Sequence, residues 1–222
     1  KPFEDRVRSV YQFMQSAITV AARDKSIIQS ARAAAINHDR QADSLAINWA
    51  IDISQSDTIT FKGYEHGYRP SAVSGTDRLF YDRDKPYTKS IPHFNYYKAS
   101  DYAHVPTAYV IPQAYNGIIE RMQRNNVKVN QLKGDGILHL TYARIEDYDT
   151  GKRPYEGHYL HNKVKVSWAK RSRAYRPGDY VIYTNQPAIR YIVETLEPTA
   201  PDSYFAWNFF DSFVQQKEYF SA

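Results

Sequence analysis

The chain has 222 residues, which is enough to bury a hydrophobic core and to form one large domain or two small ones. It contains no cysteine, and this excludes disulfide bonds and thiolate metal sites. The formal net charge is +5, from 29 basic and 24 acidic residues scattered along the chain, so no nucleic-acid partner is expected. No apolar run approaches the roughly 20 residues of a transmembrane helix, and no membrane span is predicted.

Residues 2–36 are predicted to form one long helix. Pro2 suits a first helical turn, and Glu4 and Asp5 lie where the helix dipole favours acidic side chains. Apolar residues follow at spacings of three, four and seven: Phe3, Val7, Val10, Met14, Ala17, Ile18, Ala21, Ile28, Ala31 and Ala35. This apolar stripe needs a partner surface.

Strands are predicted after this helix. Apolar and polar residues alternate at 45–53 and again at 58–64, and a further extended piece lies at 78–82. We therefore expect residues 45–90 to form an antiparallel meander.

A proline-rich segment follows at residues 86–106. It contains Pro86, Pro92 and Pro106, with aromatic residues between them. Proline at this density argues against a central strand or a helix interior, so the segment is predicted to be a long surface connection.

The second half of the chain is predicted to mix strands with short helices. Strands are expected at 107–111, 127–132, 137–148, 158–171 and 178–184, and helices at 113–126, 186–198 and 202–220. The basic stretch at 170–176 is interpreted as a solvated turn. The chain as a whole is therefore expected to have an α+β fold, in which the long helix precedes a mainly antiparallel β-sandwich-like domain with two or three additional helices.

The segment EGHYLH, residues 156–161, combines a carboxylate with two of the seven histidines. His158 and His161 would share a face in a helix, but the alternation that follows predicts a strand, in which they point to opposite faces. The chain also has no H-x-x-E or H-E-x-x-H pattern. Ordinary strand histidines are therefore favoured over a zinc site.

Other catalytic patterns are absent from the sequence. There is no G-x-S-x-G, and the nine glycines form no Walker or dinucleotide-binding pattern. Glu146, Asp147 and Asp149 could be imagined as a carboxylate pair for glycosidic cleavage, but they lie where a strand enters a predicted turn. No catalytic, cofactor-binding or metal-binding residue is predicted in this chain.

Three stretches of the sequence carry a resemblance. KPFEDRVRSVYQFM, residues 1–14, looks like the start of the last catalytic-domain helix of bacterial zinc carboxypeptidases of the carboxypeptidase A type. Residues 108–132 and 176–211 are similar to the C-terminal region that secreted members carry after the peptidase domain. The resemblance implies that residues 1–37 are the terminal helix of a peptidase domain and that residues 38–222 are a β-rich accessory domain.

The resemblance also implies what belongs to the longer protein. In that family, zinc is held by an H-x-x-E pair and a later histidine, and a glutamate activates the metal-bound water. All four residues would precede Lys1, so no cofactor is expected in this chain, which should be inactive alone, and zinc is implied for the parent protein. The location implied is secreted or periplasmic, and the partner is the peptidase domain of the same polypeptide.

The expected role of the chain is to pack on that peptidase domain and to shape access to its cleft. A different class of function is a carbohydrate or cell-wall binding module, motivated by the 20 tyrosines and the slightly basic charge, with a peptide or a glycan as the bound partner. A third hypothesis, a free-standing hydrolase, predicts bound zinc.

Five residues are expected to be structural. Arg190 and Glu194 stand four apart on a predicted helix and can pair, and Glu197 lies at the end of the same helix. Asp202 is a plausible helix cap, and Trp207 a core anchor.

Overall fold

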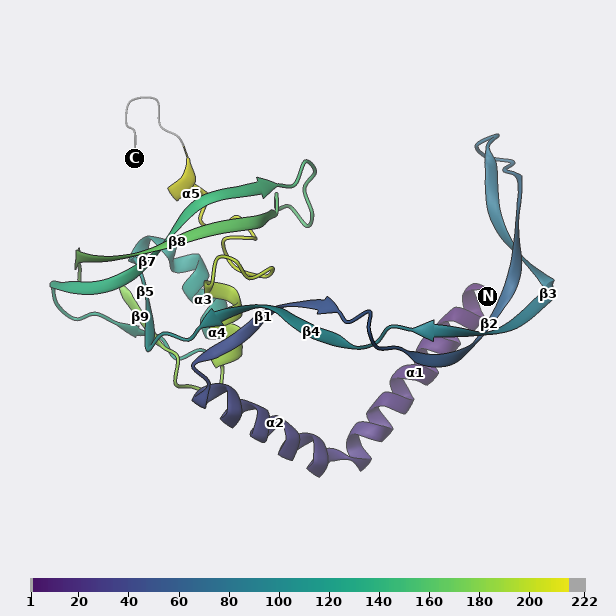
Figure 1. Ribbon diagram of the computed structural model, residues 1–222, viewed down its shortest axis with the longest axis horizontal. Helices are drawn as coiled ribbons and strands as arrows, with labels where there is room; N and C mark the ends of the chain where they lie inside the picture. The colour runs from purple at the N-terminus through teal and green to yellow at the C-terminus, as the bar shows by residue number, and fades with distance from the viewer. Residues whose placement is uncertain (1, 216–222) are drawn as a thin grey trace. The chain divides into compact units, whose positions relative to one another are not determined.

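The computed structural model describes residues 2–215 (Figure 1). By its internal contacts the chain divides into two compact units. One unit comprises Lys1–Ile47 with Asp101–Ala222, and the other is Asn48–Ser100. The boundary expected near residue 37 stays a prediction. Among the described residues, no helix has the length and hydrophobicity needed to cross a membrane.

The N-terminal segment is helical, but it forms two helices instead of one. They are α1 (Phe3–Arg23) and α2 (Lys25–Gln41), and neither has a buried residue. Asp24 separates them with φ −98° and ψ 17°, and its carboxylate accepts two hydrogen bonds from the Arg23 guanidinium, at 2.8 and 2.7 Å. The single long helix is therefore not confirmed, because this short polar side chain favours a helix end over a helix interior.

The second unit is built on a long two-stranded ribbon. Strands β2 (Asp57–Pro70) and β3 (Asp77–His93) pair antiparallel, and their register shifts between Tyr64 and Glu65. The preceding and following strands, β1 (Ser44–Ile51) and β4 (Tyr97–His104), pair with each other. The predicted meander is therefore confirmed for the antiparallel pairing of β2 with β3, and it is wrong for β1, which pairs with β4 instead of β2.

The predicted surface connection at 86–106 is also wrong. Pro86 and Pro92 lie within β3, opposite Tyr64 and Thr58. Both strands of a two-stranded ribbon are edge strands, so an edge strand can contain proline wherever the missing N–H group would face outward.

The core of the first unit is formed by a three-stranded sheet and two helices. The elements in chain order are β5 (Ala108–Ile111), the 3-10 turn η1 (Gln113–Tyr115), α3 (Asn116–Arg124), β6 (Asn130–Gln131), β9 (Tyr180–Tyr183) and α4 (Ile189–Leu196). Strand β9 lies between β5 and β6 and is antiparallel to both. These elements confirm the strands and helices predicted in these parts of the chain.

Helix α4 contributes to two clusters of buried side chains. Ile192 packs in the first cluster, with Ile111, Ile118, Ile119, Met122, Val127, Ile182 and Tyr204. Ile189 and Val193 pack in the second, with Leu45, Ile47, Ala103 and Ala200. The helix is therefore held by apolar contacts on more than one side, which fixes the position of its polar side chains.

The remaining long strands form a separate hairpin. Strands β7 (Gly136–Thr150) and β8 (His161–Tyr175) are antiparallel and include most of the basic stretch, which is therefore strand and not turn. In the described residues the sheets contain only two or three strands each. The α+β class is confirmed, whereas the β-sandwich is not.

The predicted aromatic helix at 202–220 is largely replaced by turns. Residues 201–210 form turns, α5 (Asp211–Val214) is short, and residues 216–220 of the predicted helix lie outside the described part of the chain. The Ser203 hydroxyl accepts a hydrogen bond from the backbone N–H of Ala206, at 3.0 Å, and Asn208 has φ 55°. These features favour turns over a continuous helix.

Candidate functional site

The two histidines of EGHYLH lie on the connection between β7 and β8 and at the start of β8. His158 precedes the strand, and His161 is its first residue. Between Tyr155 and His158 the chain makes a tight reversal, with positive φ at Glu156 (49°) and Gly157 (83°). The prediction that both histidines belong to one strand is therefore wrong for His158.

Both histidines bond to the segment that follows α4, His158 to the turns and His161 to the first residue of α5. His158 Nδ1 lies 2.6 Å from Asn208 Oδ1, and His161 Nε2 lies 2.9 Å from Asp211 Oδ1. The backbone N–H of His161 also donates to the carbonyl of Ala206, at 2.8 Å. These contacts fasten the end of the β7–β8 hairpin to residues 206–211.

The His161 imidazole is buried and satisfied on both ring nitrogens. Its Nδ1 atom lies 3.0 Å from Thr150 Oγ1, opposite the contact with Asp211. The rings of Tyr148 and Phe205 lie 4.6 and 5.1 Å away, between ring centroids. This environment is that of a structural histidine whose polar atoms are all paired.

A row of rings lies beside His158, and we call Tyr155, His158, Trp207 and Phe209 the ring cluster. His158 lies 5.6 Å from Trp207 and 5.3 Å from Phe209, and Tyr155 lies 6.2 Å from Trp207, between ring centroids. The indole Nε1–H of Trp207 donates to Asp202 Oδ1 at 3.2 Å. Tyr155 is 58% exposed, so the row reaches the surface at this residue.

The described residues do not fit a zinc site. They contain no group of three or more histidine, aspartate or glutamate side chains arranged to hold a metal ion. The side chains of EGHYLH therefore make hydrogen bonds and ring contacts with other parts of the chain. The zinc expected for a longer protein stays a prediction.

The acidic residues considered for glycosidic cleavage lie in β7 and pair with the neighbouring strand. Asp147 pairs with Lys165 at 2.8 Å, and Asp149 with Lys163 at 2.7 Å. The hydrogen bond from Lys165 holds the pKa of Asp147 below its usual range. These carboxylates are therefore strand residues with basic partners instead of turn acids.

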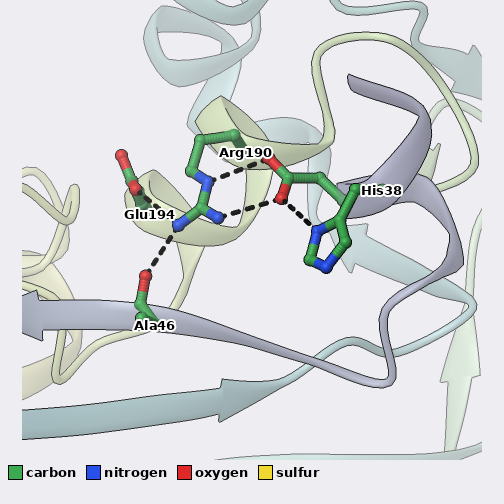
Figure 2. A network of polar contacts seen from close by, with 5 residues as sticks. His38, Ala46, Arg190 and Glu194 are labelled. Atoms are coloured by element: carbon green, nitrogen blue, oxygen red, sulfur yellow. Dashed lines mark hydrogen bonds and ion pairs between the residues drawn. The ribbon is translucent and has the colours of Figure 1, made fainter. Parts of the chain in front are cut away.

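Arg190 joins α4 to α2 and β1 (Figure 2). Its guanidinium donates to both carboxylate oxygens of Asp39, at 3.2 and 3.1 Å, and to the carbonyl of Ala46, at 2.8 Å. Its Nη1 atom also lies 3.3 Å from Glu194 Oε1. Asp39 in turn lies 3.5 Å from His38 Nδ1.

These contacts change the ionisation of Asp39. Burial raises the pKa of its carboxyl, but the hydrogen bonds and charge of Arg190 outweigh burial, so the pKa lies below its usual value. The same hydrogen bonds raise the pKa of Arg190. Both groups are therefore charged at neutral pH and form an ionic link between two helices.

The other predicted structural residues lie apart from this link. Glu197 is buried and accepts a hydrogen bond from the Tyr109 hydroxyl at 2.5 Å. Asp202 lies among turns and not at a helix start, and it accepts the hydrogen bond of Trp207, which is half-buried. No local sequence pattern indicated Asp39 or Tyr109, because they are 151 and 88 residues from their partners.

Comparison with known proteins gives one significant similarity. No protein family matches the chain, and no solved structure matches it. Over 99 residues, 45% of its length, the chain is 28% identical to carboxypeptidase 2 of Trichophyton rubrum. The chain spans 18% of the length of that relative. The chain is therefore similar, over less than half of its length, to a small part of a carboxypeptidase.

Proposed function

We propose that the chain is the C-terminal accessory portion of a secreted or periplasmic zinc metallocarboxypeptidase-like protein. In this proposal it packs on the peptidase domain of the same polypeptide and shapes access to the cleft. The observation that carries the proposal is the similarity to carboxypeptidase 2, of which the chain spans only 18%. The resemblance of residues 1–14 to the last helix of such a peptidase domain supports the same relation.

The surface of α1 supports a packing role. Among its apolar side chains, Phe3 is 75% exposed, Val10 59% and Ile18 67%. They follow the helical repeat, and burying such a stripe would be favourable by about 25 cal/mol per Å² of apolar surface. We assign the peptidase domain as the surface that covers this stripe.

Zinc and the residue that activates its water belong to the peptidase domain in this proposal. When bound there, zinc would supply the Lewis acid for water attack on a peptide bond near a carboxyl terminus. In this proposal the zinc ligands lie outside this chain, whose described residues contain no group of three or more histidine, aspartate or glutamate side chains arranged to hold a metal ion. The role of this chain in the proposal is to pack on the peptidase domain and to restrict access to its cleft.

The test compares the full-length gene product with a version that lacks residues 38–222. Release of C-terminal residues from a set of peptides, zinc content and thermal unfolding would be measured for both. We expect the truncation to alter folding, activity or the choice of peptide. Unchanged folding, activity and substrate choice would contradict the accessory role, and stoichiometric zinc on the 222-residue chain alone would favour a free-standing hydrolase.

A second candidate function is binding of a carbohydrate or of cell-wall material. The observation that favours it is the ring cluster, where Tyr155 is exposed beside Trp207. Aromatic faces with polar groups at their edge are suited to a ligand that has both apolar and hydroxyl surfaces. This function needs no contribution from a peptidase domain.

A further inference from the structure

The exposed end of the ring cluster is held rigidly by the backbone. Tyr155 and His158 exchange two backbone hydrogen bonds, at 2.8 and 2.9 Å, across the reversal at Glu156 and Gly157. Positive φ at both central residues is the geometry of the tightest hairpin turns. The ring of Tyr155 is therefore presented from a short, closed turn, and little backbone entropy would be lost when a ligand binds.

The inner side of the cluster is already filled by other side chains. His158 lies between Trp207 and Phe209, and the Arg121 guanidinium lies 4.6 Å from the Phe209 ring centroid. Asp202 fixes the orientation of the Trp207 indole through its Nε1–H. Exposed ring surface is therefore found at Tyr155, which is 58% exposed, and the half-buried Trp207 ring beside it is tilted by 52°.

The loop that carries Tyr155, together with Asp202, has two basic and two acidic side chains. Lys152 and Arg153 on the connecting loop are matched in number by Glu156 on the same loop and Asp202 beside Trp207. All four residues are exposed. A ligand with a net charge would therefore gain little electrostatic attraction from these four side chains. The carboxylates among them can accept hydrogen bonds from hydroxyl groups.

We propose that Tyr155 and Trp207 form a binding site for one pyranose ring of a neutral glycan. The C–H face of the sugar packs on the two rings, and its hydroxyl groups donate to the carboxylates of Glu156 and Asp202. This inference rests on the second candidate function, glycan binding, and not on the relation to carboxypeptidases. To that function it adds the residues of the binding site and the class of ligand, a neutral glycan.

The test uses NMR on the 222-residue chain labelled with ¹⁵N. The chain has three tryptophans, and Trp49 and Trp168 are 55% and 54% exposed, so their indole N–H signals are internal controls. The signals are assigned with Trp49→Phe and Trp168→Phe variants. Cellotetraose, chitotetraose and maltotetraose are titrated separately, and choline chloride serves as a cationic probe.

We expect at least one oligosaccharide to shift the Trp207 indole signal while the other two indole signals stay in place. Tyr155→Ala should weaken this binding roughly three- to tenfold, as for the loss of one stacked ring. Tyr159→Ala is the matched control, since Tyr159 is 47% exposed on the same loop and lies outside the ring cluster. Circular dichroism checks that both variants are folded.

The other outcomes overturn the proposal in distinguishable ways. Binding that shifts Trp49 or Trp168 but not Trp207 would leave glycan binding in place and remove this site. A response of Trp207 to choline alone would make it a cation site. If none of the three sugars shifts any indole signal and the chain does not bind to insoluble cellulose, chitin or peptidoglycan, both the site and the second candidate function fail.

Discussion

Glu197 is a carboxyl group whose ionisation is opposed by burial. It is 5% exposed, and burial raises its pKa above the usual value, although the hydrogen bond from Tyr109 and the charge of His104 act in the other direction. A raised folded pKa means that the protonated form is favoured by folding. The contribution to stability is complete below the unfolded pKa and is lost as the pH rises through the folded pKa.

Replacing Glu197 by glutamine should remove this pH dependence. Glutamine keeps an acceptor oxygen for the Tyr109 hydroxyl but cannot ionise, so Glu197→Gln should be more stable than the wild type at pH 8 and should differ less at pH 4. The free energy of unfolding would be measured in urea across this range. Glu120→Gln, on an exposed residue of α3, is the control, and the same pH trend in both variants would contradict the assignment.

Gly63 in β2 lies opposite Tyr87, and the tyrosine ring occupies the space of a side chain. A Cβ atom at residue 63 would lie 2.6 Å from Tyr87 Cζ and 2.7 Å from its hydroxyl oxygen. Gly63→Ala should therefore push the ring away and break its contact with the Lys89 ammonium, which lies 4.9 Å from the ring centroid.

We expect a loss of about 1 kcal/mol of ribbon stability from this substitution, measured as faster amide hydrogen exchange in β2 and β3. Gly136→Ala is the control, because no atom lies within 4 Å of its added Cβ. A Tyr87 ring with unchanged NMR signals in Gly63→Ala would show that the close packing is absent.

At the scale of elements, α2 is attached to the first unit by polar contacts. It has no buried residue, and its last turns are held by Arg190 on Asp39 and by Arg40, which donates twice to Asn185 Oδ1 at 2.9 and 2.7 Å. Asp39 has a side chain only 16% exposed, so it depends on its partner for charge compensation. Removing that partner leaves a desolvated carboxylate.

Arg190→Met should therefore loosen α2 while α4 stays packed. We expect a loss of about 1–2 kcal/mol in the free energy of unfolding, and faster hydrogen exchange for α2 amides than for α4 amides. Arg8→Met is the matched control, because Arg8 pairs with Glu4 in an exposed position and should have little effect. Equal exchange rates for α2 in Arg190→Met and the wild type would refute the role of the ionic link.

The elements differ in how well local sequence predicts them. Helices α3 and α4 and strands β5, β7, β8 and β9 carry their own apolar periodicity, so their positions could be predicted. The proline-rich strand β3 could not, because tolerance of proline depends on whether a strand lies at an edge, and pairing decides this. The four-residue spacing of Phe205, Phe209 and Phe213 indicated a helix, but residues 201–210 form turns.

The candidate site was harder to predict than the elements around it. EGHYLH drew attention to His158 and His161, but their partners Asn208 and Asp211 lie 50 residues further along the chain. Hydrogen-bonding partners at such separations leave no local pattern in a single sequence. The same holds for Arg190, whose local partner Glu194 was predicted and whose distant partner Asp39 was not.

At the scale of the whole molecule, the two units are stabilised differently. Both clusters of buried apolar side chains belong to the first unit, and no residue of Asn48–Ser100 is buried. An isolated two-stranded ribbon is marginally stable in water, so this unit has few contacts of its own to resist local opening. Helix α1 shares this property, because none of its residues is buried.

The exposed stripe of α1 makes the proposed contact with a peptidase domain testable by one substitution. In the 222-residue chain, Val10 is 59% exposed, so Val10→Glu should change the free energy of unfolding by less than about 0.5 kcal/mol. In the full-length gene product the same glutamate would lie against an apolar surface, and a loss of about 1–3 kcal/mol is expected.

Gln12→Glu is the matched control for this last prediction, because residues 10 and 12 lie on opposite sides of α1. It should have little effect in either protein. Thermal and urea unfolding of both variants, in the 222-residue chain and in the full-length product, would be compared. If Val10→Glu and Gln12→Glu behave alike in the full-length product, the stripe is not covered by the peptidase domain, and the packing role fails even where the relation to carboxypeptidases holds.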